Sequence, residues 1–492
     1  MSSFTKVLIP NRGEIACRIL RTLNRMGMAG VLAHHALDGD SPAVAMAPET
    51  VLLRGEPPVS AYLDADQIIT ACQNTGADAV HPGFGFLAEN ADFARKCEAA
   101  GITFIGPLPQ TMEMMGDKVA ARQFCLDNGF PLAPSVTEGG NETDFLAEIE
   151  KLGFPVLIKA AAGGGGKGMQ IVENKADLPS ALPLAKAEAA RSFGNDRVYA
   201  ERYVRSARHI EVQILGDHHG RILHLGEREC SIQRRFQKII EESPAPNLSQ
   251  ELRQKIWDIA LDIARRAEYR NAGTVEFILT PDNEIYFLEM NTRLQVEHPV
   301  TEEVFGLDLV ELQIRVARGE ALSLDPSQLK AQGHAIELRL YAEDPEGDFL
   351  PSTGRLLAFD MAQGEGVRVE NGFAPGMRVF SAFDPMLAKL ITHGKDRDQA
   401  LERACRALDQ TLVLGVTTNV DYLARILAHA DFKAGRIHTG FLPDHENDLE
   451  PPPLTDREIK LLLAATALGA RAFTDPAFDL PHPHSCIGNW RN

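Results

Sequence analysis

The chain has 492 residues, of which 44% are apolar and 24% charged, so it has an ordinary soluble composition and the length for several lobes. Its net charge of −18 argues against binding to nucleic acid or to an anionic membrane, because both attract cationic surfaces. No apolar run is as long as a membrane span, and we expect no signal or transit peptide, because a predicted strand follows the first few residues. Seven scattered cysteines without a Cys-x-x-Cys motif indicate reduced thiols, so we expect a cytoplasmic protein.

The first lobe, at residues 1–115, alternates predicted strands and helices. Short buried strands are predicted at residues 7–9, 31–33, 79–80 and 102–105. They form a Rossmann-like parallel sheet. Asn11 is expected to cap the first helix, with Glu14 completing a capping box three residues later. The segment His81-Pro-Gly-Phe-Gly-Phe-Leu-Ala-Glu-Asn90 follows a strand, where open α/β sheets bind ligands.

A run of glycines follows a predicted strand that ends in a lysine. The strand ends at Lys159, four glycines occupy residues 163–166, and Lys167 lies inside the loop. The amides of such a loop can surround phosphates, and lysines neutralise them. The alternative is a flexible linker. The loop is not a Walker A motif, because no Gly-Lys-Ser/Thr follows at the required spacing.

Two apolar runs on either side of Asp282-Asn283 predict a β-hairpin. In the register that a two-residue turn imposes, Glu276 lies directly opposite Glu289. Like charges placed in this way repel each other, so we expect a cation between them. Carboxylate oxygens suit Mg²⁺ or Mn²⁺, which bind through few carboxylates plus substrate phosphates. The alternative is a solvated outer face on which both glutamates are incidental.

The period of two along a strand assigns more residues to the face of Glu276. The residues expected there are Ile278, Ile285, Phe287 and, if the strand continues, Asn291. After the hairpin, Arg293, Gln295 and Glu297 alternate, so in extended backbone they project together. They supply a guanidinium fork for an anion, an amide and a carboxylate base.

Together these motifs resemble the ATP-grasp fold and, more narrowly, biotin carboxylase. The ATP-grasp resemblance rests on Lys118, Lys159, the glycine loop, Glu201, the paired Glu276 and Glu289, and the run from Asn291 to Glu297. The narrower resemblance rests on Asn11-Arg-Gly-Glu-Ile-Ala, His81-Pro-Gly-Phe-Gly-Phe-Leu, Met115-Gly-Asp-Lys, Cys230-Ser-Ile-Gln-Arg-Arg and Arg293-Leu-Gln-Val-Glu-His-Pro-Val-Thr-Glu302. These matches run in order from residue 6 to about residue 442.

The resemblance implies an α/β fold in three parts and an activity. The N-terminal sheet would be followed by an ATP-grasp domain at residues 116–330, with a mobile lid at about 132–204, and by a mixed α/β C-terminal lobe at 331–445. The implied reaction is ATP-dependent carboxylation of carrier-bound biotin by bicarbonate through carboxyphosphate, the first half-reaction of a biotin-dependent acyl-CoA carboxylase.

The resemblance also implies roles for individual residues. ATP would be bound by Lys118, Lys159, Gly164, Gly165, Gly166, Gly168, Met169, Glu201, Val204, His209, Gln233, Ile278, Leu288 and Ile437. Two Mg²⁺ or Mn²⁺ ions would be held by Glu276, Glu289 and Asn291. Bicarbonate would be bound by Lys238, Arg293, Gln295 and the backbone of Val296, with Glu297 as its base. Arg339 would stabilise charge on the biotin ureido oxygen, and Phe84, where the family often has tyrosine, would belong to the same substrate site.

Residues 446–492 are expected to form a linker and a helix. They resemble the segment that follows the carboxylase region in acyl-CoA carboxylase α-subunits of the methylcrotonyl, geranyl and propionyl type. The Ala-Met-Lys-Met hallmark of a biotin carrier is absent from the sequence, so we expect biotin on a carrier domain outside this chain. A carboxyltransferase subunit is the further expected partner, in a homodimer or a larger carboxylase complex.

Some features leave alternatives open. Phe236 stands where the family often has histidine or asparagine, which puts a ribose contact there in doubt. Cys230 suggests a nucleophile, but the implied mechanism needs none and a buried structural thiol is the simpler interpretation. His482-x-His484-x-Cys486 offers metal ligands in a proline-rich tail without further ligands. The alternative functions are another ATP-grasp carboxylate–amine ligase and a non-catalytic ATP-binding subunit of a carboxylase complex.

Overall fold

The short apolar runs near the N-terminus form a parallel sheet, as predicted. The computed structural model describes residues 4–139, 141–161 and 169–474, and the chain divides into two units, 1–445 and 446–492. The first sheet has the order β3 (Glu49–Leu53), β2 (Ala29–His35), β1 (Lys6–Ile9), β4 (Ala79–Val80) and β5 (Thr103–Phe104). Its helices are α1 (Gly13–Arg25), α2 (Pro42–Met46), α3 (Ala65–Thr75) and α4 (Ala91–Ala99), with the 3₁₀ turns η1 (Ala36–Asp38) and η2 (Pro58–Leu63).

The start of α1 differs from the prediction of a capping box. Arg12 is the N-cap residue, and no side chain caps the helix there. The side-chain amide of Asn11 instead donates to the carbonyls of Pro82 and Phe84, each at 2.8 Å. Glu14 is buried and lies 3.0 Å from Lys389. Tertiary partners therefore replace the local cap that the sequence pattern suggested.

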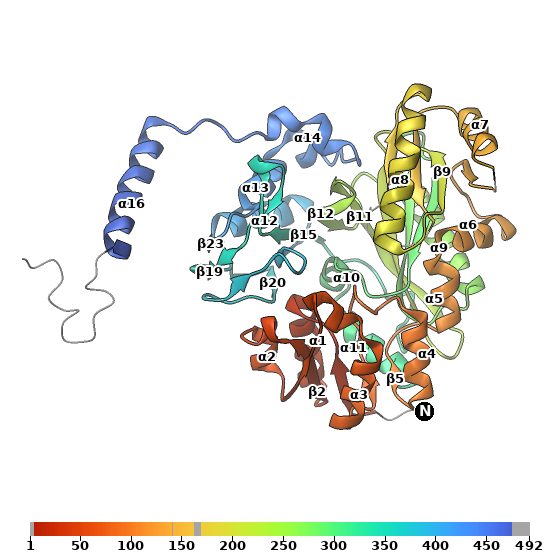
Figure 1. Cartoon of the computed structure of the whole chain (residues 1–492), viewed down its shortest axis with the longest axis horizontal. Helices are drawn as coiled ribbons and strands as arrows, with labels where there is room; N and C mark the ends of the chain where they lie inside the picture. Colours follow the sequence, from red (N-terminus) through yellow and green to blue (C-terminus); the bar gives the residue numbers. More distant parts are fainter. Residues whose placement is uncertain (1–3, 140, 162–168, 475–492) are drawn as a thin grey trace, which may run out of the picture. The chain divides into compact units, whose positions relative to one another are not determined.

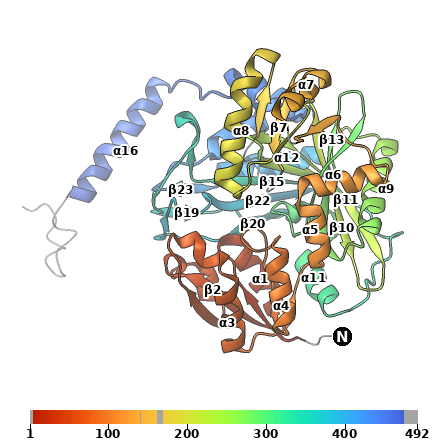
Figure 2. The same ribbon diagram turned by 45° about the vertical axis from the view of Figure 1, so that its right-hand side comes forward.

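The second part contains a four-stranded antiparallel sheet with helices against it. The strand order is β6 (Ser135–Thr137), β9 (Val198–Arg202), β7 (Val156–Ala160) and β8 (Gln170–Val172). The helices of this region are α5 (Pro109–Gly116), α6 (Lys118–Asp127), α7 (Glu142–Leu152) and α8 (Leu178–Phe193), with η3 (Lys175–Asp177) before α8. Helices α7 and α8 lie against this sheet (Figure 2), and Phe145 and Ile149 of α7 and Leu182 and Ala185 of α8 pack with apolar residues of the strands.

An eight-stranded sheet carries most of the expected site. Its order is β14 (Ile285–Asn291), β13 (Asn271–Leu279), β10 (Arg208–Gly216), β11 (Ile222–Arg234), β12 (Gln237–Ser243), β15 (His334–Tyr341), β22 (Met386–Gly394) and β20 (Val367–Asn371), with antiparallel neighbours throughout. The helices α9 (Gln250–Arg266), α10 (His298–Phe305) and α11 (Leu309–Ala317) connect its strands. Because β12 pairs with β15, one sheet joins strands of residues 208–291 to strands of residues 334–394 (Figure 1).

Shorter elements complete the C-terminal region. The small strand pairs are β16 (Glu343–Asp344) with β17 (Leu350–Pro351), β18 (Gly354–Arg355) with β21 (Arg378–Val379), and β19 (Ala358–Asp360) with β23 (Leu412–Leu414). The helical elements are η4 (Pro345–Gly347), α12 (Arg397–Asp409), α13 (Val420–Ala428), α14 (Ala430–Lys433) and α15 (Phe441–Asp444). The second unit contains η5 (Glu446–Leu449) and α16 (Asp456–Thr474). Among the described residues, no helix is long and apolar enough to cross a membrane.

The turn between β13 and β14 is one residue longer than predicted. The N–H of Thr280 donates to the carbonyl of Glu284, and the N–H of Asn283 donates to the carbonyl of Thr280, both at 2.9 Å. The loop is therefore residues 281–283. Asn283 has a φ of 65°, the left-handed conformation that three-residue hairpin loops require and that asparagine tolerates.

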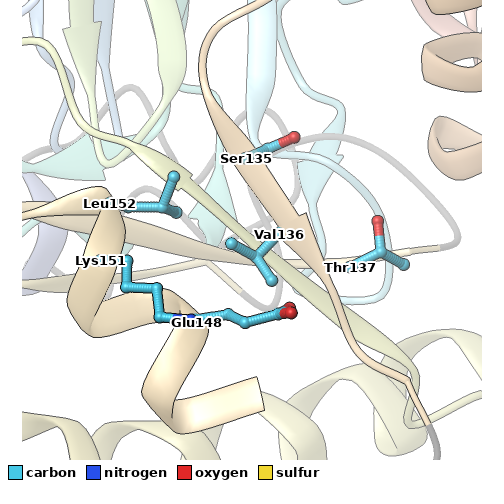
Figure 3. Close-up of a pocket in the computed structure, with 6 residues that line it drawn as sticks. All are labelled: Ser135, Val136, Thr137, Glu148, Lys151 and Leu152. Atoms are coloured by element: carbon cyan, nitrogen blue, oxygen red, sulfur yellow. The ribbon is translucent and has the colours of Figure 1, made fainter. Parts of the chain in front are cut away.

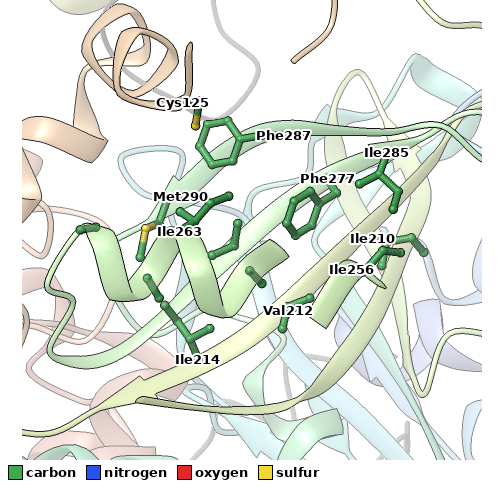
Figure 4. Packing of buried hydrophobic residues seen from close by; sticks show 14 of the residues in the cluster. Cys125, Ile210, Val212, Ile214, Ile256, Ile263, Phe277, Ile285, Phe287 and Met290 are labelled. Carbon is green, nitrogen blue, oxygen red and sulfur yellow. The ribbon is translucent and has the colours of Figure 1, made fainter. Parts of the chain in front are cut away.

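A β-bulge then corrects the register before it reaches the two glutamates. Leu288 is the extra residue, and beyond it Glu276 pairs with Glu289 as predicted. Before the bulge the register is shifted by one residue, which moves side chains to the other face. The prediction that Ile285 and Phe287 share the face of Glu276 is therefore wrong. Both pack in the apolar core with β10 and α9, and Figure 4 shows them pointing into it.

Candidate active site

Two carboxylates from adjacent strands face each other and are each paired with donors. Glu276 accepts hydrogen bonds from Asn291 at 2.7 Å and from Gln295 at 2.9 Å. Glu289 forms an ion pair with Lys118, the first residue of α6. Burial raises the pKa of each carboxyl, but neighbouring cations outweigh it and hold both pKa values below the usual range, Glu276 well below. Both groups are therefore ionised, as metal ligands must be.

Lys238 of β12 lies among three buried carboxylates. Its Nζ donates to Glu211 at 2.6 Å, Glu276 at 2.9 Å and Glu297 at 2.6 Å. Burial lowers the pKa of Lys238, but attraction to Glu211, Glu276 and Glu297 dominates, so the pKa lies well above its ordinary value. The ammonium is charged at neutral pH and is positioned to bind an anion beside a carboxylate base.

Glu297 lies between two cations contributed by different strands. Its second oxygen accepts a hydrogen bond from Arg339 of β15 at 2.9 Å, and its side chain is 1% exposed. Burial raises the pKa of this carboxyl, but Lys238, Arg339 and Arg228 lower it more, and the net result is a pKa well below the ordinary value. Glu297 is thus a carboxylate in the absence of substrate, the protonation state that a general base requires.

The run from Arg293 to Glu297 is not extended over its whole length. Arg293 donates to Gln295 at 2.9 Å and to Glu89 of the His81–Asn90 segment at 2.9 Å. Glu297, however, is the N-cap residue of α10, with φ −81° and ψ 11°. The chain turns here because Pro299 lies in the first turn of the helix, a position that proline favours. The extended backbone on which the predicted alternation depended is therefore absent at Glu297, although Gln295 and Glu297 both contact the same charged cluster.

On the four-stranded sheet, Lys159 of β7 forms an ion pair with Glu201 of β9, and both side chains are buried. Arg122 of α6 lies 3.3 Å from the same carboxylate. Burial lowers the pKa of Lys159, Glu201 opposes this shift, and Lys118 reinforces it. Two lysines close enough to influence each other form a cationic region suited to phosphates. Met169 immediately precedes β8.

The predicted glycines Gly164, Gly165, Gly166 and Gly168 lie outside the described residues, so the structure says nothing about that loop.

Several other predicted nucleotide-binding residues lie along adjoining segments. His209 of β10 is 2.8 Å from Glu276 and 2.6 Å from Gln233, and it pairs with Ile278 across the strands. Val204 follows β9 and is half-buried. Leu288 is the bulge residue of β14. Ile437 is buried and lies just before Thr439, whose N–H donates to the carbonyl of Ala207 next to β10.

The donor set fits a divalent metal. Glu276, Glu289 and Asn291 supply hard oxygen atoms from one hairpin, and in this structure the amide of Asn291 hydrogen-bonds Glu276. His209, Glu211 and Glu276 also place one ligand atom each within 4.8 Å of the others. Two ionised carboxylates with an amide match the preference of Mg²⁺ or Mn²⁺ for oxygen ligands shared with phosphate.

Sequence reasoning missed several residues of this site. Those residues are Glu89, Glu211, Arg228, Glu241 and Lys389. Alternation of His209, Glu211 and Gln213 along a strand was a signal for Glu211, which contacts Lys238. Lys389 is the single lysine in the apolar strand β22, and a buried lysine of this kind needs a partner. Glu241 forms an ion pair with Arg339. No sequence pattern marked it, because Glu241 and Glu242 are adjacent and only the structure shows which of them points toward Arg339.

Of the remaining features, Cys230 lies within this cluster, where its Sγ and one oxygen each of Glu211 and Glu297 are within 4.8 Å of one another. Phe236, with φ 66°, lies in the turn between β11 and β12. Cys230 is buried, and burial raises its thiol pKa well above the ordinary value, which disfavours a nucleophile. A hollow of about 440 Å³ lies between β6 and α7, lined by residues that include Val136 and Glu148 (Figure 3). None of its lining residues belongs to the motifs described above. His482, His484 and Cys486 lie outside the described residues.

Family models match three consecutive segments of the chain. They are described as "Biotin carboxylase, N-terminal domain" at residues 3–112, "Carbamoyl-phosphate synthase L chain, ATP binding domain" at 117–325 and "Biotin carboxylase C-terminal domain" at 337–444. Among solved structures, the biotin carboxylase domain dimer of Hydrogenobacter thermophilus 2-oxoglutarate carboxylase, in complex with MgADP, ADP and bicarbonate, has a TM-score of 0.89. It is 39% identical and covers 92% of this chain and 100% of that chain. A Campylobacter jejuni biotin carboxylase complex with β-γ-ATP has a TM-score of 0.87 at 39% identity, covering 90% of this chain and 99% of that one.

Curated relatives are similar over most of the chain as well. The mitochondrial methylcrotonoyl-CoA carboxylase subunit alpha of Dictyostelium discoideum is 45% identical over 99% of this chain, which spans 70% of that relative. For the subunits of rat and Arabidopsis thaliana the chain spans 66% and 64% of their lengths. The biotin carboxylase of Halalkalibacterium halodurans is 46% identical over 90% of this chain and 98% of its own length. These matches, with the ATP-grasp fold and the charged cluster around Glu297, show that this chain belongs to the biotin carboxylase family of ATP-dependent enzymes.

Proposed function

We propose that the chain catalyses ATP-dependent carboxylation of biotin by bicarbonate, the first half-reaction of a biotin-dependent acyl-CoA carboxylase, with the residue roles given below. The observation that carries these roles is the position of Glu297. One of its oxygens contacts Lys238 and the other contacts Arg339, while Lys238 also reaches Glu276 on the predicted metal hairpin. Lys238 therefore links the base Glu297 directly to Glu276, one of the predicted metal ligands.

The nucleotide is assigned to the β13–β14 hairpin and the four-stranded sheet. Lys118 and Lys159 bind phosphate oxygens, and their ion pairs with Glu289 and Glu201 position them at this site. Glu276, Glu289 and Asn291 would hold a divalent metal, which would neutralise phosphate charge. The segment at about 132–204 is proposed as a lid, because carboxyphosphate hydrolyses in water and must form in a closed site.

Bicarbonate is assigned to Lys238, Arg293, Gln295 and the backbone of Val296. Glu297 removes the bicarbonate proton, and the freed oxygen attacks the γ-phosphorus. The bond between that phosphorus and the ADP oxygen breaks, which yields carboxyphosphate and ADP. The general acid–base step contributes about 10²–10⁴-fold to the rate.

Biotin is assigned to the region of Arg339 and Phe84. Arg339 stabilises the negative charge that develops on the ureido oxygen when the biotin nitrogen loses its proton. The C–O bond of carboxyphosphate breaks, the released phosphate takes up this proton, and the nitrogen takes up the carboxyl group. Because the base Glu297 and Arg339 are in contact, both parts of the reaction occur at one site.

The partners follow from the relatives, the location follows from the scattered cysteines, and both remain part of the proposal. Family members act in biotin-dependent carboxylase complexes and form dimers. We infer a homodimer or a larger complex, with a biotin carrier domain and a carboxyltransferase subunit as partners. The cytoplasm is the proposed location, although several relatives are named as mitochondrial.

One assay separates this proposal from the alternatives. Purified protein is given Mg-ATP and free biotin, with and without bicarbonate and, in parallel, with a carboxylic acid and an amine in place of bicarbonate; both ADP release and carboxybiotin are measured. We expect ATP cleavage that requires bicarbonate and carboxybiotin that requires all three substrates. ATP cleavage that depends on an amine instead indicates a carboxylate–amine ligase, and ATP binding without cleavage indicates a non-catalytic subunit; either result overturns the proposal.

A further inference from the structure

Lys389 is a buried cation that the proposed reaction does not use. It lies in the sequence Met386-Leu-Ala-Lys-Leu-Ile391 of β22, and its side chain has 0% exposure. Burying an ammonium in an apolar strand is unfavourable unless it is paired and hydrogen-bonded. The partners of Lys389 therefore indicate what this position does.

One partner is the backbone next to the proposed base. Lys389 Nζ donates a hydrogen bond to the carbonyl oxygen of Val296 at 2.6 Å. That carbonyl belongs to the planar peptide that joins Val296 to Glu297, so the contact fixes the plane from which the Glu297 side chain projects. Hydrogen bonds from a charged donor are stronger than those from a neutral donor. The ammonium of Lys389 can therefore hold the Val296 carbonyl firmly.

The second partner is Glu14 of α1, whose carboxylate lies 3.0 Å from Lys389 Nζ and is 3% exposed. Burial raises the pKa of Glu14, and attraction to Lys389 is the largest opposing effect. Near the start of the same helix, Asn11 holds the carbonyls of Pro82 and Phe84. The ring of Phe84 is centred 5.9 Å from Lys389 Nζ. The Asn11–Glu14 motif thus supports both Lys389 and the adjoining loop.

The strand register places Lys389 directly beside Arg339. The two residues are paired across β15 and β22. Arg339 donates to the carboxylate of Glu297, and Lys389 donates to the peptide carbonyl immediately before Glu297. Adjacent strands therefore hold the same residue at its side chain and at its backbone.

We propose that Lys389 is a positioning residue for Glu297 and the anion-binding run, and that Glu14 holds Lys389 in place. This inference rests on the proposed role of Glu297 as the base. Loss of the contact releases the Val296–Glu297 peptide and moves the base relative to bicarbonate. A displacement of about 1 Å costs about 10²-fold in rate.

The competing explanation is that Lys389 only neutralises the buried Glu14. Under that explanation Lys389→Met destabilises the protein because it leaves a buried carboxylate unpaired, and its kinetics change only through instability. The double variant Lys389→Met/Glu14→Gln removes both charges while nearly keeping the side-chain volumes. It therefore separates charge balance from the hydrogen bond to Val296.

The experiment compares four proteins: wild type, Glu14→Gln, Lys389→Met and the double variant. Melting temperature, bicarbonate-dependent ATP cleavage, KM for bicarbonate and KM for ATP are measured for each. Arg253→Met is the matched control, because it also leaves a buried glutamate, Glu227 at 2.8 Å, without its arginine in a part of the fold outside the charged cluster. It is expected to lower the melting temperature and to leave KM for bicarbonate unchanged.

We expect Glu14→Gln to lose less activity than Lys389→Met, because Lys389 loses one partner but keeps its hydrogen bond to Val296. Lys389→Met should lose about 10²-fold in kcat/KM for bicarbonate with an unchanged KM for ATP. The double variant should regain stability but not this activity. If it regains both, Lys389 only balances Glu14 and the inference is overturned. Absence of bicarbonate-dependent ATP cleavage in the wild type is a separate outcome, which overturns the proposed function instead.

Discussion

Glu241 of β12 and Glu337 of β15 face each other across the strand pair, and both side chains are fully buried. Burial, partly opposed by Arg339, raises the pKa of Glu241 to about 7, and burial also raises the pKa of Glu337 well above its ordinary value. Repulsion between two buried carboxylates disfavours the state in which both are ionised. The pair therefore holds a proton beside Arg339 under conditions in which exposed glutamates have lost theirs.

This relationship predicts a pH dependence of stability. At this pair the folded protein binds more protons than the unfolded chain between about pH 4.3, the ordinary pKa of glutamate, and pH 7. The contribution of the pair to stability should therefore fall as pH rises through this window. Glu337→Gln removes one of the two groups, so its melting temperature relative to wild type should increase from pH 5 to pH 8. A difference that stays constant with pH would show that the two carboxyls titrate independently of folding.

Glu297→Gln tests the base. The amide keeps the size and most hydrogen bonds of the side chain but cannot accept the bicarbonate proton. Bicarbonate-dependent ATP cleavage and biotin carboxylation should fall together by about 10²–10⁴-fold. Both rates are measured with the same protein sample, and the melting temperature confirms that the variant is folded. Normal ATP cleavage in the presence of bicarbonate contradicts the assignment.

Arg339→Ala should separate the two halves of the reaction. Carboxyphosphate still forms, because Glu297 and Lys238 remain, but the charge on the biotin ureido oxygen loses its partner. Much of the ATP cleavage should persist while carboxybiotin falls, so the ratio of ADP to carboxybiotin rises. Arg339→Lys retains the charge without the planar fork and should give an intermediate ratio. An unchanged ratio in both variants assigns the role elsewhere.

The facing carboxylates of the hairpin predict a specific metal response. Glu276→Gln and Glu289→Gln should each raise the Mg²⁺ concentration needed for half-maximal activity and lower turnover, while the protein stays folded. Glu284→Gln changes an exposed carboxylate near the turn of the same hairpin and serves as the control. Activity is titrated with Mg²⁺ at fixed ATP. A wild-type Mg²⁺ requirement in both variants would show that the pair is structural.

Local sequence patterns correctly predicted elements whose residues interact mainly with near neighbours. The parallel strands of the first sheet are short apolar runs, and the β13–β14 hairpin is marked by residues that form turns. The pairing of Glu276 with Glu289 was also predicted, but two deviations cancelled to produce it. The loop has one more residue than expected, and the bulge at Leu288 restores the register. A bulge has no distinct composition, so the faces of Ile285 and Phe287 could not be read from alternation.

The identities of Lys238, Arg293, Glu297 and Arg339 came from sequence motifs and a family resemblance, whereas their contacts came only from the tertiary structure. Glu14 shows the difference, because its spacing from Asn11 suggested a local cap and it instead pairs with Lys389, distant in the chain. A local pattern records what neighbours along the chain can satisfy. Buried charges need partners, and the order of the strands in the sheet determines which partners lie near them. Here β12, β15 and β22 are neighbours in one sheet, although they are far apart in the sequence.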